Sequence, residues 1–124
     1  MTARDYYRSL QQTISRAFYV LDSQISYSEI DVNECYISGR LILSNGYQLH
    51  IAEYVITGMS IVRTKYRFHL QTAEAELVAR WDNSPHHKEI DTFPDHCHLR
   101  NGSIVSSPAM NIESVLAVTL AFLD

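Results

Sequence analysis

The sequence is poor in cysteine, with only Cys35 and Cys97 among its 124 residues. Two thiols so far apart in sequence do not make a disulfide framework or a paired-cysteine zinc knuckle, so we expect both to be reduced. Basic residues are also few, since 10 Lys and Arg stand against 14 Asp and Glu and give a net charge of -4. No overall positive field therefore attracts nucleic acid or membranes, and any site for a polyanion must be local.

Long apolar runs are missing as well. The N-terminus, MTARDYYRSLQQ, lacks the apolar core of a signal peptide, and the longest apolar stretch, near the C-terminus, is too short to cross a membrane. The sequence also lacks internal repeats and linkers rich in Gly, Pro or Ser. We therefore expect a cytoplasmic protein with no membrane contact, folded as a single domain over residues 1–124.

Helical periodicity is present at both ends of the chain. Between Ala3 and Leu21 the apolar residues are spaced by three or four, which predicts an amphipathic helix. Asn111 is a good N-cap, and Glu113 follows it in the first turn, so a second and very apolar helix is predicted over residues 112–123. Both helices have an apolar face to bury.

A hairpin is predicted over residues 35–55. Asn45 and Gly46 mark its turn, and a three-residue loop with Gly46 in the left-handed conformation places Leu43 opposite Tyr47. A two-residue loop would instead mix apolar and polar residues on each face. The longer loop therefore sets a register in which one face of the hairpin is apolar.

Three further segments alternate between apolar and polar residues. Residues 23–30 show a short, weak strand pattern, whereas residues 62–70 and 76–82 alternate more strictly. A four-residue turn between the last two places Phe68 opposite Ala79. The expected fold is α+β, a meandering antiparallel sheet of four or five strands with both helices on its apolar face and a basic, histidine-rich face opposite.

Histidine is the one compositional anomaly. Five of the six histidines fall between residues 69 and 98: His69, His86, His87, His96 and His98. Prolines and an Asn-Gly pair predict an irregular loop over residues 83–110, which we expect to fold back onto the polar face with Phe93 and Pro94 packed as anchors. Alternation places three charged side chains together on that face: Arg67, Arg80 and Asp82. Arg63 and Lys65 share this parity, and we expect both to be solvated.

Two chemistries fit this combination of histidine and arginine. In the first, imidazoles act as general acid and base on an RNA phosphodiester whose 2′-hydroxyl is the nucleophile, and no metal or other cofactor is needed. The candidate acids and bases are His86, His96 and His98. The candidates for binding phosphate and orienting these histidines are Arg67, His69, Arg80 and Asp82.

In the second chemistry the histidines hold a divalent transition metal such as zinc or nickel. The candidate ligands are His86, His87, His96 and His98, with Asp82 or Cys97 as a further ligand. Their spacing matches no standard zinc motif. A third possibility is a module without enzymatic activity, whose polar face binds nucleic acid or another protein.

Three motifs resemble the TumE family of small prokaryotic toxins. They are YRFHLQ at residues 66–71, RWDNSPHH at residues 80–87 and TFPDHCH at residues 92–98. Relatives often have a basic residue at the position of Cys97. The resemblance implies the toxin of a type II toxin-antitoxin system, held inactive by a cognate antitoxin that is a separate, DNA-binding protein encoded nearby. Together with the residues above, it favours a toxin that acts on RNA as a ribonuclease, and a homodimer stays open.

Overall fold

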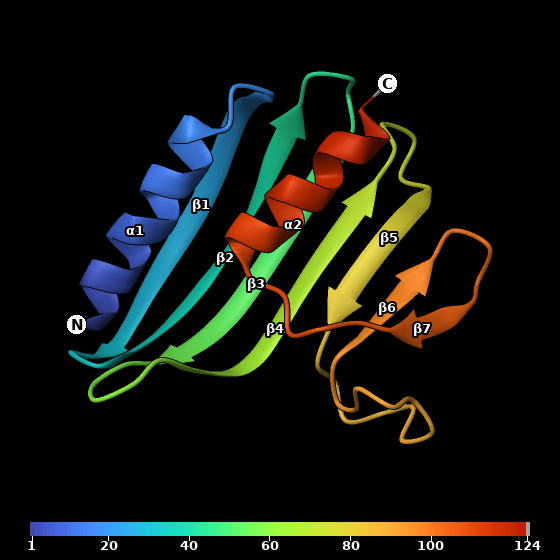
Figure 1. The fold of residues 1–124 in the computed structure, drawn as a ribbon. Coiled ribbons are helices and arrows are strands. Elements are labelled where there is room, and N and C mark those ends of the chain that lie inside the picture. Colours follow the sequence, from blue (N-terminus) through green and yellow to red (C-terminus); the bar gives the residue numbers. More distant parts are fainter. Residues whose placement is uncertain (124) are drawn as a thin grey trace.

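The computed structural model describes residues 1–123, and in this range the chain forms an α+β fold. Its elements are α1 (Ala3–Arg16), β1 (Val20–Asp31), β2 (Glu34–Leu43), β3 (Gln48–Ile56), β4 (Val62–Gln71), β5 (Leu77–Asp82), β6 (His96–Leu99), β7 (Ile104–Ser106), α2 (Ile112–Thr119) and a final 3-10 turn (Leu120–Phe122). The seven strands form one antiparallel sheet in chain order. Both helices cover the same face (Figure 1), and the opposite face, here called the open face, carries the site described below.

The predicted class is confirmed, but the sheet is larger than predicted. The weak pattern at residues 23–30 belongs to β1, which pairs with β2 along most of its length although all of its residues are exposed or only partly buried. The segment 83–110, expected to be irregular, contributes the short strands β6 and β7. These strands are held in the sheet by main-chain hydrogen bonds, which do not require alternating apolar side chains, so the apolar pattern of the sequence did not reveal them.

The first helix is shorter than predicted. It begins after Thr2, whose side chain accepts a hydrogen bond from the Asp5 N–H at 3.2 Å, while the Asp5 carboxylate accepts one from the Thr2 N–H at 2.9 Å. It ends at Arg16, and the apolar residues Phe18 and Leu21 lie beyond it with 85% and 65% of their surface exposed. These two residues extended the apparent helical stripe without belonging to the helix.

The second helix begins where the sequence predicted. Asn111 is its N-cap, and its side chain accepts a hydrogen bond from the Ser114 N–H at 2.8 Å. The α-helix ends at Thr119 and continues as the 3-10 turn, so regular α-helix covers only the first two thirds of the predicted span. The cap is a local interaction, which is why the sequence alone located it.

The hairpin of β2 and β3 has the predicted register. Leu41 pairs with Leu49 and Gly39 with Ile51, and the Leu43 N–H donates to the Tyr47 carbonyl at 2.9 Å. Gly46 has a φ of 88°, the left-handed conformation that the three-residue loop requires. The apolar face of this hairpin lies under the helices.

Between β4 and β5 the register differs by two residues from the prediction. Phe68 pairs with Trp81 and Leu70 with Ala79, because the turn is longer than expected and an irregularity follows Leu70. A shift of two residues leaves every side chain on its predicted face, since side chains alternate with a period of two. Arg67 therefore still lies on the open face, where it pairs with Asp82.

Arg63 was predicted to lie solvated on the polar face, and this prediction is wrong. The pairing of β3 with β4 is irregular at Thr64, so that Tyr54 pairs with Lys65 but Val55 pairs with Arg63. The extra residue turns Arg63 onto the helix-covered face, where its guanidinium lies 3.2 Å from the Glu53 carboxylate. Lys65 remains exposed on the open face, as predicted.

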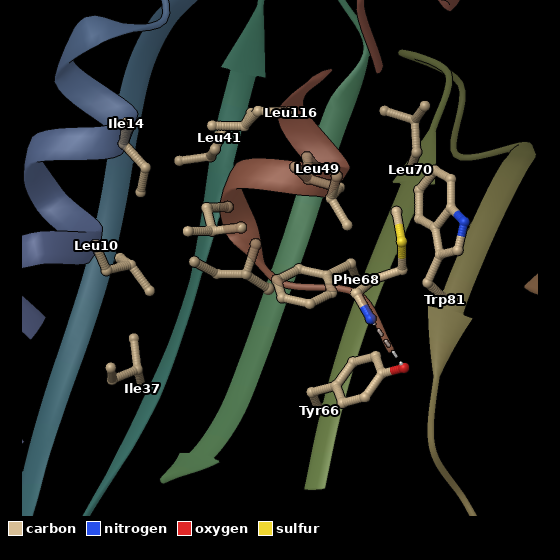
Figure 2. Packing of buried hydrophobic residues seen from close by; sticks show 14 of the residues in the cluster. Leu10, Ile14, Ile37, Leu41, Leu49, Tyr66, Phe68, Leu70, Trp81 and Leu116 are labelled. Atoms are coloured by element: carbon tan, nitrogen blue, oxygen red, sulfur yellow. Dashed lines mark hydrogen bonds between the residues drawn. The ribbon is translucent and has the colours of Figure 1, made fainter. Parts of the chain in front are cut away.

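The core lies between the helices and the covered face of the sheet. Figure 2 shows Leu41, Leu49 and Phe68 on neighbouring strands, with Leu116 of α2 beside them. Phe68 is fully buried, and Trp81 extends the core onto β5. This packing makes the sheet a rigid platform for the side chains on its open face.

Candidate functional site

Strands β4, β5 and β6 bring charged and imidazole side chains together on the open face. The pairing places Arg67 opposite Asp82, and Asp82 opposite His96 on the other side. Arg80 lies opposite His98. Because directly paired residues of neighbouring strands project to the same face, the register alone assembles this cluster.

A pocket of about 190 Å³ opens at the cluster. It is lined by Arg67, Arg80, Asp82, Ser84, His86, His87, His96 and His98. The loop after β5 thus folds back onto the polar face, as predicted. We call this hollow the histidine pocket.

His96 lies at the base of the histidine pocket with 2% of its surface exposed. A carbonyl oxygen only accepts hydrogen bonds, so the contact of 2.8 Å between His96 Nδ1 and the Pro94 carbonyl places a hydrogen on Nδ1. The other ring nitrogen, Nε2, lies 3.0 Å from Asp82 Oδ1 and 3.1 Å from His98 Nε2. His96 Nε2 therefore carries a lone pair beside the Asp82 carboxylate, and a hydrogen on His98 Nε2 or a metal ion among these atoms offsets the repulsion between them.

His98 has its Nε2 3.5 Å from Asp82 Oδ2. Burial and the nearby Arg80 guanidinium lower the pKa of His98, against the opposing effect of the Asp82 carboxylate. The imidazole is therefore neutral at pH 7, with a lone pair available to accept a proton or to bind a metal ion. Its side chain keeps 19% of its surface exposed, so it is accessible from the pocket.

His87, and not His86, joins the two histidines of β6. The ligand atoms of His87, His96 and His98 all lie within 4.8 Å of one another. His86 is exposed and its ring centre lies 6.5 Å from that of His87, which places it at the rim. His87 has a φ of 60°, a conformation that costs a non-glycine residue about 1–3 kcal/mol and is often found at functional sites.

The loop is anchored by polar contacts, and the predicted packing of Phe93 and Pro94 is wrong. Phe93 is 39% exposed and Pro94 is also exposed. Instead, Thr92 Oγ1 donates to the Asp95 carbonyl at 2.7 Å, and the Tyr66 hydroxyl donates to Asp95 Oδ1 at 2.7 Å. A buried core tyrosine thus holds the loop directly before β6 in place.

His69 lies on the open face but does not line the histidine pocket. It pairs with Arg80 on β5 and with His50 on β3, and its pKa is lowered by burial and by the charge of Arg80. Within residues 1–123, the buried Nε of Arg80 has no hydrogen-bond partner, and its nearest anion is Asp82 Oδ2 at 3.7 Å. The Arg80 side chain is 33% exposed and lines the pocket, so the part of the guanidinium that does not face Asp82 is suited to bind an anion there.

Comparison with protein families identifies the chain. A family model described as Toxin TumE matches residues 8–124, nearly the whole chain. The chain belongs to the TumE toxin family. The match extends well beyond residues 66–98, where the motifs lie, and membership implies an antitoxin partner. Neither the curated proteins nor the solved structures contain a match.

In this TumE-family toxin, the structure places His87, which the sequence named only as a candidate metal ligand, beside His96 and His98, and it adds Ser84 to the pocket. Ser84 donates its backbone N–H to Asp82 Oδ1 at 3.0 Å and so holds the carboxylate that faces His96. The adjacent histidines His86 and His87 gave no indication of which one points inward, since that depends on the turn of the loop. In the described part of the chain, no helix is long and apolar enough to cross a membrane.

Proposed function

We propose that this TumE-family toxin cleaves RNA in the histidine pocket and is the toxin of a type II toxin-antitoxin system. The observation that carries the proposal is the presence in one pocket of two guanidinium groups, those of Arg67 and Arg80, with imidazoles around a buried carboxylate. Guanidinium groups bind phosphate through paired hydrogen bonds, and imidazoles transfer protons near neutral pH. These are the groups that cleavage by attack of the RNA 2′-hydroxyl uses, one to bind the phosphate and the other to transfer protons.

We assign the base to His98 and the acid to His87. Neutral His98 takes the proton of the 2′-hydroxyl, the 2′-oxygen bonds to phosphorus, and the bond from phosphorus to the 5′-oxygen breaks. His87 gives a proton to that 5′-oxygen, so the products are a 2′,3′-cyclic phosphate and a 5′-hydroxyl. His96 is too buried to reach RNA and acts as a positioning residue between Asp82 and His98.

Cleavage of a labelled RNA by tag-free protein in EDTA tests this proposal. Replacement of His98 or His87 by alanine is expected to reduce the rate by about 10² to 10⁴, the usual contribution of a general acid or base. His50→Gln is the matched control, because His50 is a histidine of the open face that does not line the pocket. Equal cleavage by the parent protein and the His98 variant contradicts the proposal. A lack of cleavage with toxicity that tolerates loss of both histidines favours a binding module.

A metal centre is the second candidate, favoured by the distances at the base of the pocket. Ligands bound tetrahedrally to zinc at about 2.0–2.1 Å lie about 3.3 Å from one another. His96 Nε2 lies 3.1 Å from His98 Nε2 and 3.0 Å from Asp82 Oδ1, and His87 lies close enough to complete the set. The hydrogen bond from His96 Nδ1 to the Pro94 carbonyl is also of the kind that orients metal-binding histidines.

Metal analysis separates the two candidates. Near-stoichiometric zinc or nickel in the parent protein, lost in His96→Ala but kept in His86→Ala, supports the metal centre. Cleavage that stops in EDTA and returns with a transition metal supports it further. Cleavage that continues in EDTA supports acid-base chemistry without a metal.

A further inference from the structure

A second pocket adjoins the histidine pocket on the open face. It has a volume of about 220 Å³, and its lining includes Tyr36, Ala52, Tyr54, Lys65, Arg67 and Ser84. Two of these residues, Arg67 and Ser84, also line the histidine pocket. The two hollows are therefore neighbours with the Arg67 guanidinium between them. We call the second one the tyrosine groove.

Two tyrosines form one side of the tyrosine groove. Tyr36 on β2 pairs directly with Tyr54 on β3, and their ring centres lie 4.5 Å apart at an angle of 36°. Tyr54 is 40% exposed, so part of an aromatic ring faces the groove. The small side chain of Ala52, two residues away on the same face of β3, leaves room beside the rings.

Positive charge lies on the other side of the groove. Lys65 pairs with Tyr54 across β3 and β4, and Arg67 follows two residues later on the same face. Both side chains are exposed. In a protein with a net charge of -4, this is a local cationic strip of the kind that a polyanion requires.

We propose that the tyrosine groove binds a base of single-stranded RNA next to the phosphate that is cleaved. The base stacks on the ring of Tyr54, supported by Tyr36, while Lys65 and Arg67 neutralise the adjoining phosphates. A duplex keeps its bases stacked inside the helix, so only an unpaired strand can offer a base to such a surface. The inference rests on the proposed function, because it places the scissile phosphate beyond Arg67 in the histidine pocket.

Binding is measured with a fluorescent single-stranded RNA that carries 2′-O-methyl groups, so that no cleavage can occur. Tyr54→Ala is expected to raise Kd by about 5- to 150-fold, the effect of losing one stacked base. Tyr54→Phe keeps the ring and is expected to keep Kd within about twofold. For an RNA duplex, the parent protein and Tyr54→Ala should have the same Kd.

The matched control is Tyr27→Ala, which removes one ring of another stacked tyrosine pair. The ring centres of Tyr27 on β1 and Tyr7 on α1 lie 4.7 Å apart, and neither residue lines the histidine pocket or the tyrosine groove. It is expected to leave Kd unchanged. The thermal midpoint of each variant shows that the protein is folded in the binding assay.

The outcomes separate this inference from the proposed function. Loss of single-strand binding in Tyr54→Ala, with no cleavage of unmodified RNA by the parent protein, supports binding of a base in the tyrosine groove but overturns the ribonuclease and, with it, the position of the groove beside a cleaved phosphate. If the parent protein cleaves RNA and Tyr54→Ala has unchanged Kd and KM values, the inference that the tyrosine groove binds a base is overturned, while the proposed function stands. If Tyr54→Ala binds RNA normally but no longer binds the antitoxin, the inference is also overturned, and the tyrosine groove is assigned to antitoxin binding.

Discussion

Replacement of Arg63 by alanine is expected to destabilise the protein in a way that depends on pH. The Arg63 guanidinium lies 3.2 Å from the Glu53 carboxylate, whose side chain is fully buried, while Arg63 itself is 16% exposed. The Tyr6 hydroxyl donates to both carboxylate oxygens at 3.0 and 2.9 Å, and Arg63 also donates to the Met110 carbonyl. The pair therefore links α1, the sheet and the segment that precedes α2.

The size of the effect follows from the burial of the carboxylate. Burial raises the pKa of Glu53 above its ordinary value of 4.5, although Arg63 and Tyr6 act against the rise. At 3.2 Å and an effective dielectric constant of about 20, the attraction is at most about 5 kcal/mol. Removing one partner of a buried pair typically costs about 3–5 kcal/mol, which is the loss we expect for Arg63→Ala at pH 8.

The loss should be smaller at low pH. Without Arg63 the pKa of Glu53 rises further, because a charge that lowered it is gone. A group with a raised pKa in the folded state contributes stability below its unfolded pKa and loses that contribution as the pH rises through the folded pKa. Arg63→Ala should therefore be milder at pH 5 than at pH 8.

Urea unfolding at the two pH values measures this difference. The double variant Arg63→Ala, Glu53→Gln carries no buried charge at this position. We expect its destabilisation relative to the parent protein to differ less between the two pH values than that of Arg63→Ala, and we expect it to be more stable at pH 8 than Arg63→Ala. Arg100→Ala is the control, because its pair with Glu76 is largely exposed and should matter little. Equal destabilisation at both pH values, or strictly additive effects in the double variant, would refute the reasoning.

Three further predictions concern the open face and the core. Arg67→Ala should strongly reduce kcat/KM for RNA. Arg67→Lys should keep only part of the parent value, because a planar guanidinium matches phosphate oxygens and an ammonium group does not. A parent-like kcat/KM in Arg67→Lys would contradict this prediction. Phe68→Ala should cost about 3–5 kcal/mol in urea unfolding, and a loss below about 1 kcal/mol would be inconsistent with its complete burial. Burial is the main factor that lowers the pKa values of His50, His69 and His98 below 6.5. The stability that these neutral imidazoles contribute above pH 6.5 should therefore be lost as the pH falls through their pKa values in the folded state. An unchanged melting temperature between pH 7.5 and pH 5 would contradict this prediction.

Features that depend on neighbours in sequence were predicted well. Asn45 and Gly46 set the loop of the first hairpin, and Asn111 marked the start of α2. A left-handed glycine and a capping side chain each act within a few residues, so their consequences can be worked out without the rest of the fold. The length of α1 was overestimated because Phe18 and Leu21 continued its spacing by chance.

Features that depend on distant segments were predicted less well. The irregular pairing at Thr64 places Arg63 beside the buried carboxylate of Glu53. Glu53 lies ten residues earlier, on another strand, so the contact is not visible in the local pattern. The strand β6 is only four residues long, and its place is decided by its pairing with β5 and by the contact of Tyr66 with Asp95. Patterns of apolar residues do not record such contacts.

The sequence by itself determined that Arg67, Arg80 and Asp82 share one face, because alternation in a strand survives any shift of register by two residues. It also located the histidine-rich segment that completes the site. Only the tertiary structure decided that His87 points into the pocket while His86 stays at its rim. That choice depends on how the loop turns against β4 and β6, and loop position is set by hydrogen bonds to distant residues, which local sequence patterns do not encode.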